Sequence, residues 1–245
     1  MSKSKSAAIP VVFRDLGQMP FGEAWKLQQE LHSGIVARRR TGPNTAGQAP
    51  GPGNDWLLFV EHPHVYTLGK SGKETNLLVD SRRLEAMGAS FYHIDRGGDI
   101  TYHGPGQLVG YPIFDLEAAG LGVKAYIHNI ESAIITLLEH YGITATRYEK
   151  GTGVWLDTDD PARVRKICAI GVKVSRAITM HGFALNVNTD LSYFRAINPC
   201  GFTREGVTSM AVELGKEVDF DEVKENLKRI FAETFGYTYF SETGE

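Results

Sequence analysis

The sequence predicts an α+β fold in which a mixed β-sheet is flanked by helices. Three observations carry this prediction: short apolar or alternating runs typical of strands, longer amphipathic segments typical of helices, and one closely spaced pair of strand-like runs. That pair, Lys166–Val174 and Met180–Val187, is separated only by Ser175–Thr179. A connection this short joins antiparallel neighbours, so the sheet is not wholly parallel.

The elements follow one another irregularly along the chain. Strands are predicted at Trp56–Glu61, Phe91–Ile94, Leu108–Phe114, Gly153–Leu156, Lys166–Val174 and Met180–Val187. Helices are predicted at Gly22–Arg39, Val123–His140 and Asp221–Phe235. The second helix has a stripe of apolar residues, namely Ile127, Ile130, Ile134, Leu137 and Leu138. The third has a capping box at Asp219 and Glu222 and a stop at Gly236.

Length and composition are those of a globular protein that forms a single domain over residues 1–245. Within it, Thr41–Asp55 is rich in glycine and proline, and we expect a flexible surface loop there. The net charge of -3 argues against a nucleic-acid binder, and no apolar run is long enough for a membrane span. The two cysteines indicate a reducing, cytoplasmic location.

Three motif-like patterns are set aside. The glycines around Pro105 precede a strand-like run, whereas a dinucleotide-binding loop opens a helix. Gly69-Lys70-Ser71 lacks the first glycine of a phosphate loop. The pair His62 and His64 has Pro63 between them and no acidic or thiolate partner nearby, so we expect structural or substrate-facing histidines rather than a metal site.

One stretch is unusually rich in both glycine and polar side chains. Arg96–Gln107 holds four glycines and one proline in twelve residues, which predicts a loop whose backbone closely approaches another group. A binding loop is favoured over a turn whose polar groups satisfy one another, because loops held by a scaffold often carry sites.

The predicted hairpin pairs small residues. If its turn centres near Arg176 and Ala177, Ala169 lies opposite Ala184 and Gly171 opposite Gly182. Such a pairing leaves either a groove for an alkyl chain, walled by Ile170 and Phe183, or room for a covering helix.

A cysteine nucleophile is the third candidate. Cys200 stands between Pro199 and Gly201, which is typical of a loop position, although free cysteines are often buried and inert. A nucleophilic thiol needs a cation or a histidine nearby. Lys166, His181 and His103 are the candidates, and a solvated surface charge is the alternative for Lys166.

Taken together, these runs resemble the octanoyltransferases of lipoate biosynthesis. The resemblance is carried by Arg96–Ile113, Lys166–Leu191, Ile197–Gly201 and Glu61–Gly69, which keep the order of that family. It implies the fold of lipoate and biotin protein ligases, which is like that of class II aminoacyl-tRNA synthetases and biotin synthetases. Cys168 stands where the family has a small residue, and we expect a buried hydrophobe there.

The resemblance also implies a reaction. Octanoyl-acyl carrier protein is the implied donor, and the implied acceptor is a lysine on a lipoyl domain of a 2-oxoacid dehydrogenase subunit or on the glycine-cleavage H protein. Cys200 matches the acyl-thioester nucleophile and Lys166 the lysine that lowers its pKa. The substrate-binding residues would be Arg96, Gly97, Gly98, Asp99, Ile100, Thr101, Tyr102, His103, Ala169, Ile170, Gly171, Gly182, Phe183 and Ala184. No cofactor or metal is implied.

Other functions remain as alternatives. An ATP-dependent lipoate or biotin ligase of the same fold would adenylate a free acid without using Cys200. A non-catalytic acyl or carrier-protein binding module would form no covalent adduct, and a cysteine hydrolase would release free acid.

Overall fold

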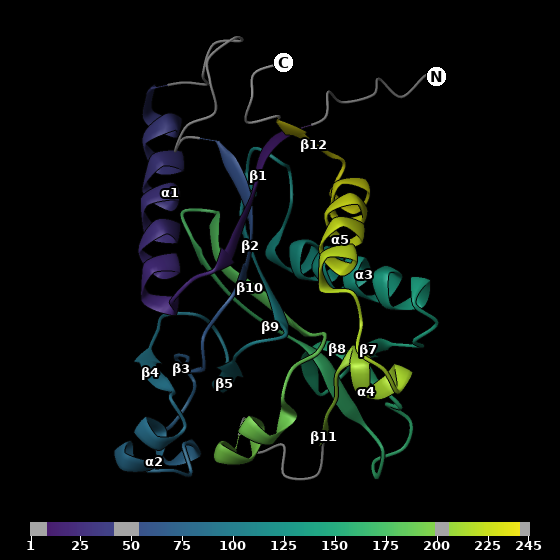
Figure 1. The fold of residues 1–245 in the computed structure, drawn as a ribbon. Coiled ribbons are helices and arrows are strands. Elements are labelled where there is room, and N and C mark those ends of the chain that lie inside the picture. The colour runs from purple at the N-terminus through teal and green to yellow at the C-terminus, as the bar shows by residue number, and fades with distance from the viewer. Residues whose placement is uncertain (1–8, 42–53, 199–205, 241–245) are drawn as a thin grey trace.

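The computed structural model describes residues 9–41, 54–198 and 206–240, and these form a mixed sheet between helices (Figure 1). The strand order is β12 (Tyr237–Phe240), β1 (Ile9–Gln18), β2 (Asp55–Glu61), β6 (Gln107–Ile113), β10 (Ile178–Asn186), β9 (Arg165–Ser175), β8 (Gly151–Leu156) and β7 (Thr146–Tyr148). A short strand, β11 (Gly206–Val207), also pairs with β9. β1 runs parallel to β2 and β12, and β11 parallel to β9, whereas the other pairs are antiparallel. The predicted mixed sheet is confirmed.

Helices cover both faces of this sheet. Figure 1 shows α1 (Phe21–Thr41) on one side, and α3 (Val123–His140) and α5 (Phe220–Phe235) on the other. α3 has the predicted bounds, and its Ile130, Ile134 and Leu137 are completely buried against the sheet. α5 begins after Asp219, whose carboxylate accepts hydrogen bonds from two backbone N–H groups, and ends at Gly236 with φ of 69°. Both predicted helix ends of α5 are therefore confirmed.

A second, three-stranded sheet lies below α1 in Figure 1. Its order is β4 (Ser90–His93), β3 (Val65–Leu68) and β5 (Ile100–His103), and the six-residue helix α2 (Ser81–Ala86) is part of the connection between β3 and β4. The prediction of one continuous loop over Arg96–Gln107 is wrong in its centre, because β5 pairs with β3 there. Ile100, Tyr102 and His103 of this strand are buried and Thr101 is half-buried, so the segment is enclosed by its neighbours rather than exposed as a surface loop.

All six predicted strands are present, each within two residues of its predicted bounds. The sequence did not predict β1, β3, β5, β7, β11 or β12. Most of these strands are two to four residues long, so their alternation is too brief to recognise. The two end residues of the segment predicted as a flexible loop, Thr41–Asp55, belong to regular elements, because Thr41 ends α1 and Asp55 begins β2. Its residues 42–53 lie outside the described residues.

Two arginines at the end of α1 fasten this helix to the sheet. Arg39 pairs with Asp115 through its Nε at 2.6 Å and also through Nη2. Arg38 reaches Asp55 at 3.2 Å and Asp115 at 3.4 Å, and both carboxylates are almost completely buried. The two carboxylates of this ion-pair network are buried, whereas the arginine side chains are 21% and 26% exposed.

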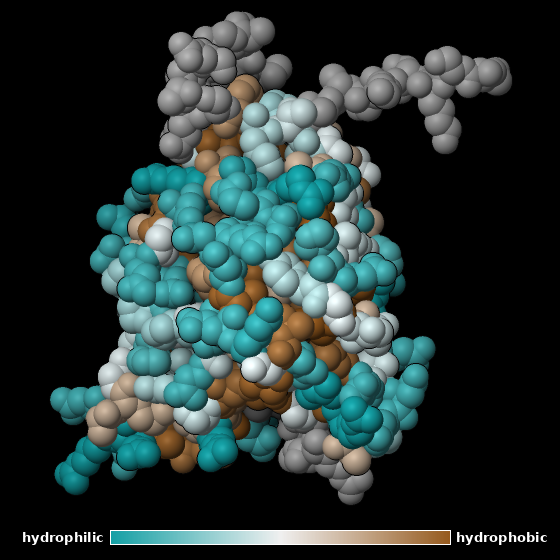
Figure 2. Space-filling view, turned by 45° about the vertical axis from the view of Figure 1, so that its right-hand side comes forward, coloured by the Kyte–Doolittle hydropathy of each residue, from teal (hydrophilic) through white to brown (hydrophobic). Residues whose placement is uncertain are grey.

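The molecular surface is mixed in character. Figure 2 shows a largely hydrophilic face on which apolar side chains gather in a band below the centre. Among the described helices, none combines the length and the apolar character needed to cross a bilayer.

Close packing of β6 against β10 requires glycine at two positions. A Cβ at Gly182 would lie 2.2 Å from the carbonyl oxygen of Gly110, and one at Gly110 would lie 2.1 Å from the Phe183 ring. We therefore expect Gly182→Ala to lower the free energy of unfolding by about 2 kcal/mol, because overpacking displaces backbone here. Urea denaturation measures this change.

Gly122→Ala is the matched control, since nothing lies within 4 Å of a Cβ at Gly122. It should lower the free energy of unfolding by less than about 1 kcal/mol, which is the cost of a weaker N-cap residue. Equal effects of the two substitutions would contradict the steric explanation.

Candidate active site

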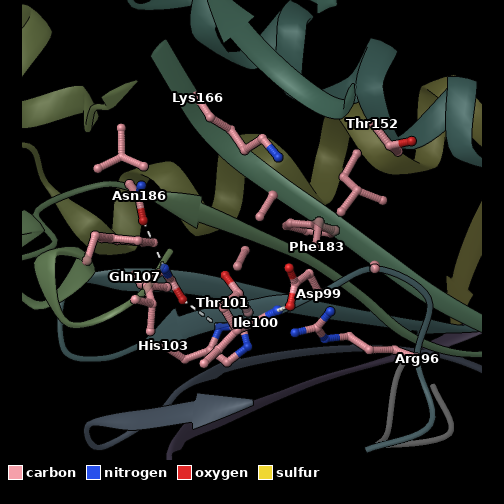
Figure 3. A pocket seen from close by; sticks show the side chains of 18 of the residues that line it. Arg96, Asp99, Ile100, Thr101, His103, Gln107, Thr152, Lys166, Phe183 and Asn186 are labelled. Atoms are coloured by element: carbon pink, nitrogen blue, oxygen red, sulfur yellow. Dashed lines mark hydrogen bonds between the residues drawn. The ribbon is translucent and has the colours of Figure 1, made fainter. Parts of the chain in front are cut away.

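A cavity of about 1100 Å³ lies between the β9–β10 hairpin and the strand β5 (Figure 3). Its walls also include residues of β6, β8 and β11, the loop before β5, Phe21 of α1, and the short 3-10 helix η2 (Leu191–Ala196). Apolar side chains and a few convergent polar groups share these walls. This combination is typical of a pocket for a small organic molecule.

The β9–β10 hairpin has the register that the sequence predicted. Its turn centres on Arg176 and Ala177, whose φ angles are 53° and 56°. Ala169 pairs with Ala184 and Gly171 with Gly182. Two left-handed residues are what a type I′ hairpin turn requires. The four small residues therefore lie side by side on neighbouring strands, and all of them line the cavity.

Other parts of the protein also pack closely against Gly171 and Gly182. A Cβ at Gly171 would lie 3.0 Å from Cδ of Arg96, and Gly182 admits the carbonyl oxygen of Gly110. The sequence left open whether the small residues accommodate a ligand or a covering helix. In the structure, the loop at Arg96 and the strand β6 come closest to the two glycines.

Arg96 joins the loop before β5 to both sheets. Its Nη2 donates to the Thr67 carbonyl at 2.8 Å and to the Thr67 hydroxyl at 3.0 Å, on the small sheet. The next residue, Gly97, donates its N–H to the Val172 carbonyl of β9 at 2.9 Å. Arg96 is only 7% exposed, so a positive charge is held in the cavity wall by oriented acceptors.

Lys166 extends into the cavity from the opposite wall (Figure 3). Its Nζ lies 4.4 Å from the centre of the Trp155 ring, within the range of a cation–π contact. Trp155 is buried and is fixed by a hydrogen bond from its Nε1 to the Gly151 carbonyl at 2.9 Å. The Lys166 backbone carbonyl accepts from Thr208 N–H at 2.9 Å, directly after β11. The backbone of Lys166 is therefore fixed by a hydrogen bond, and its ammonium group is positioned by the Trp155 ring.

Cys200 lies outside the described residues, so its distance from Lys166 is not defined. The segment 199–205 is bounded by Asn198 and Gly206, and both of these residues line the cavity. The chain thus enters and leaves this segment at the cavity wall.

Every predicted substrate-binding residue except Tyr102 lines the cavity. Tyr102 is fully buried, and its hydroxyl lies 2.7 Å from Nδ1 of His64, whose ring stacks on Tyr193 at 4.1 Å. Since side chains alternate along a strand, Tyr102 points away from the face that Thr101 and His103 present. Its side chain is therefore part of a structural aromatic cluster between β5 and η2.

The two histidines proposed as thiol partners are both buried in the cavity wall. Burial lowers the pKa of His103 to about 3 and that of His181 to about 4. Both are neutral at physiological pH, which leaves Lys166 among the three proposed partners of the thiol. His181 also has a φ of 58°, and Gln28 holds it there by accepting its backbone N–H at 2.9 Å.

Sequence reasoning missed several residues of the cavity wall. They include Asn186, which is 4% exposed, and also Thr152 and Trp155, the ring of which contacts Lys166. Gln107, which is 1% exposed, is the last residue of the predicted binding stretch Arg96–Gln107. Asn186 had a visible signal, because it is a polar residue that directly follows the apolar run Phe183–Leu185 at the end of β10. Phe21 had none, since an aromatic residue at a helix start is ordinary.

The sequence predicted structural or substrate-facing histidines at positions 62 and 64, and neither His62 nor His64 lines the cavity. His62 is buried between the Met19 carbonyl and the Tyr111 hydroxyl, each at 2.7 Å. In the part of the chain that is described, no three histidine, cysteine or acidic residues are grouped so as to hold a metal ion.

Cys168 is completely buried in the core, as expected, and burial raises the pKa of its thiol. A thiol that is both inaccessible and protonated is unreactive.

We therefore expect Cys168→Ala to leave the number of thiols that react with Ellman's reagent in the native protein unchanged. After denaturation the same variant should show one reactive thiol fewer than wild type, and a loss in the native state would contradict this assignment.

Comparison with protein families matches residues 22–232 to the lipoyl protein ligase A/B catalytic domain. An octanoyltransferase of Parabacteroides distasonis is 53% identical over 223 residues, which cover 91% of this chain and 97% of the relative. An octanoyltransferase of Bacteroides fragilis is 54% identical over 211 residues, covering 86% and 91% respectively.

Solved structures share the fold at low sequence identity. A bipartite lipoate protein ligase from Thermoplasma acidophilum, studied with its E2 lipoyl domain, has a TM-score of 0.63 and 19% identity, covering 97% of this chain and 88% of the other. A T. acidophilum lipoate protein ligase with bound lipoic acid has a TM-score of 0.62 and 19% identity, covering 95% and 88%. The expected ligase-like fold is confirmed.

Proposed function

This chain belongs to the lipoyl protein ligase A/B catalytic domain family, and from that membership we propose that it transfers an octanoyl group from octanoyl-acyl carrier protein to a lysine of a lipoyl domain. It is an acyltransferase, as its relatives at about 50% identity over most of the chain are. In our proposal Cys200 carries the octanoyl group as a thioester, and Lys166 assists both steps.

One observation supports this assignment above the others. The Lys166 side chain enters a large cavity whose wall includes Asn198 and Gly206, the residues that bound the segment containing Cys200. A lysine ammonium near a thiol favours the thiolate, which is the nucleophilic form.

The cavity suits an acyl chain. Ile170 and Phe183 give it apolar walls, and its volume of about 1100 Å³ exceeds what an eight-carbon chain needs. Burying six methylene groups stabilises the bound chain by about 5 kcal/mol, at roughly 0.8 kcal/mol each. The remaining space would take the pantetheine arm of the donor or the side chain of the acceptor lysine.

In the first step the Cys200 thiolate attacks the carbonyl carbon of the donor thioester. The bond from this carbon to the pantetheine sulfur breaks, and the departing sulfur takes a proton from the Lys166 ammonium. Octanoyl-Cys200, a pantetheine thiol and neutral Lys166 remain. Backbone N–H groups of the Arg96 loop or near Cys200 would stabilise the oxyanion.

In the second step a neutral acceptor lysine attacks octanoyl-Cys200. The amide bond forms, the carbon–sulfur bond breaks, and Lys166 takes the proton that the amine loses. The thiolate and the ammonium are thereby restored. Neither step requires ATP, a metal ion or an organic cofactor.

We propose residues 1–245 as one catalytic domain acting in the cytoplasm, where the thiol stays reduced. The proposed acceptors are lipoyl domains of 2-oxoacid dehydrogenase subunits and the glycine-cleavage H protein. The ligase structures of the same fold, one of them studied with its E2 lipoyl domain, agree with an acceptor of this class.

Cys200→Ser should abolish the covalent intermediate. Wild-type protein mixed with octanoyl-acyl carrier protein should gain the mass of one octanoyl group in intact-protein mass spectrometry, and the variant should gain none. Cys168→Ala is the matched control and should acylate normally.

An octanoyl adduct mapped to Cys168 would contradict the assignment. Product formed from free octanoate and ATP, with Cys200→Ser as active as wild type, would instead identify an ATP-dependent ligase.

Lys166→Ala should slow alkylation of the Cys200 thiol roughly tenfold at neutral pH, because less thiolate forms without the ammonium. The rate should recover at higher pH, as measured by iodoacetamide labelling across a pH series. Lys150→Ala removes a second cavity lysine, which lies over Tyr148 instead, and should change the profile less. An unchanged profile in Lys166→Ala would remove this lysine from the proposed role.

A further inference from the structure

Three buried polar side chains in the cavity wall form one hydrogen-bonded chain (Figure 3). Asn186 Nδ2 donates to the Thr208 carbonyl at 2.9 Å. Gln107 Nε2 donates to Asn186 Oδ1 at 2.8 Å and to the Tyr102 carbonyl at 3.2 Å. His103 Nδ1 lies 2.8 Å from Gln107 Oε1.

Two backbone carbonyls fix the direction of every bond in this chain. A carbonyl oxygen only accepts, so the amide nitrogen of Asn186 must face Thr208 and that of Gln107 must face Tyr102. The oxygen of Gln107 therefore faces His103. Because this oxygen also only accepts, Nδ1 of His103 must carry the proton.

We propose that Gln107 and Asn186 are positioning residues that hold His103 as the neutral Nδ1–H tautomer and fasten β11 beside Lys166. Nε2 of His103 is then unprotonated, and it forms no hydrogen bond with any residue in the described part of the chain. The cavity therefore has an uncharged acceptor at this point of its wall.

The same chain reaches the proposed catalytic lysine at its other end. The Thr208 carbonyl accepts from Asn186, while the Thr208 N–H donates to the Lys166 carbonyl at 2.9 Å. Val207 pairs with Lys166 in the sheet. Asn186 thus holds the strand that follows the Cys200 segment against the strand that carries Lys166. The kinetic part of this inference rests on the proposed acyl transfer, whereas the tautomer part does not.

The uncharged amide of Gln107 keeps His103 neutral, which a carboxylate at this position would not do. An uncharged wall suits an apolar chain, whereas a carboxylate on Nδ1 would favour an imidazolium in the cavity. Among the described residues, the other titratable or charged groups that act on His103 are His62, Arg96 and His181, and each of them disfavours the imidazolium.

The two other buried histidines act as internal references. His62 Nδ1 lies 2.7 Å from the Met19 carbonyl, so it is an Nδ1–H tautomer. His181 Nε2 lies 3.3 Å from the Asp95 carboxylate, so it is an Nε2–H tautomer. The ring nitrogens of these histidines should therefore give distinct and predictable NMR signals.

The first test is the ring 15N spectrum of the full chain labelled with 15N-histidine. In wild type at neutral pH we expect His103 as Nδ1–H, His62 as Nδ1–H and His181 as Nε2–H. Gln107→Met and Gln107→Glu both remove the amide donor, but only Glu retains an acceptor for Nδ1. Met should therefore give a mixed tautomer at His103 alone, and Glu should retain the proton on Nδ1.

Wild-type His103 found as Nε2–H or as an imidazolium would overturn the proposal, and this outcome does not depend on whether any variant folds. Identical His103 signals in wild type and Gln107→Met would also overturn it.

The second test is kinetic and uses a matched pair of substitutions. Asn186→Asp replaces the donor that faces Thr208, and we expect kcat for octanoyl transfer to fall about tenfold, as for loss of one buried hydrogen bond. Asn188→Asp makes the same change two residues later, where the amide is bonded to the Val218 backbone instead, and kcat should fall less than twofold.

Equal losses of kcat in the two variants would overturn the role of Asn186. If wild type shows the expected tautomers but transfers no octanoyl group, the proposed function fails while the assignment of His103 stands.

Discussion

The pairing of β9 with β10 is the interaction on which the rest of the site depends. One hairpin supplies Lys166, the small residues Ala169–Gly171 and Gly182–Ala184, and Asn186. Side chains alternate between the faces of a strand, so a shift of the register by one residue would bring different side chains of β9 and β10 opposite one another and would break the pairing of the small residues. The left-handed turn at Arg176 and Ala177 fixes the register from one end of the hairpin.

Burial on both faces keeps that hairpin in place. Every residue of β10 is buried, and its alternate side chains pack into separate cores, one beneath α1 and one beneath α3 and α5. Phe183 belongs to the second core and Ala184 to the first. The cavity thus adjoins a sheet that is covered on both sides, and its polar groups are held by hydrogen bonds to a rigid backbone.

The parts of the fold that could be predicted are those with long, regular patterns. The stripe of α3 and the hairpin register were readable because several residues repeat one period or because one short turn sets the pairing. The small sheet was not readable, because β5 has four residues and is embedded among glycines. β1 was missed since Pro10 lies near its start and Arg14 and Asp15 interrupt its apolar residues.

The same distinction applies to the site. Most of the predicted substrate-binding residues line the cavity, and they could be predicted because they lie in a few continuous runs of the sequence. The hydrogen-bonded chain from His103 to Thr208 was hidden, since it joins residues that are far apart in the sequence and depends on which amide atom faces which carbonyl. The aromatic environment of Tyr102 was hidden for a similar reason, because the face of β5 on which it lies follows from pairing with β3.

The parallel pairing of β1 with β12 has a consequence for biosynthesis. Ile9 lies beside Tyr237, so the first described strand borders the last one. The ribosome synthesises β1 long before β12, so one edge of β1 stays unpaired during that time. Because an unpaired edge can join a strand of another nascent chain, this sheet is most vulnerable to misassembly until β12 has been synthesised.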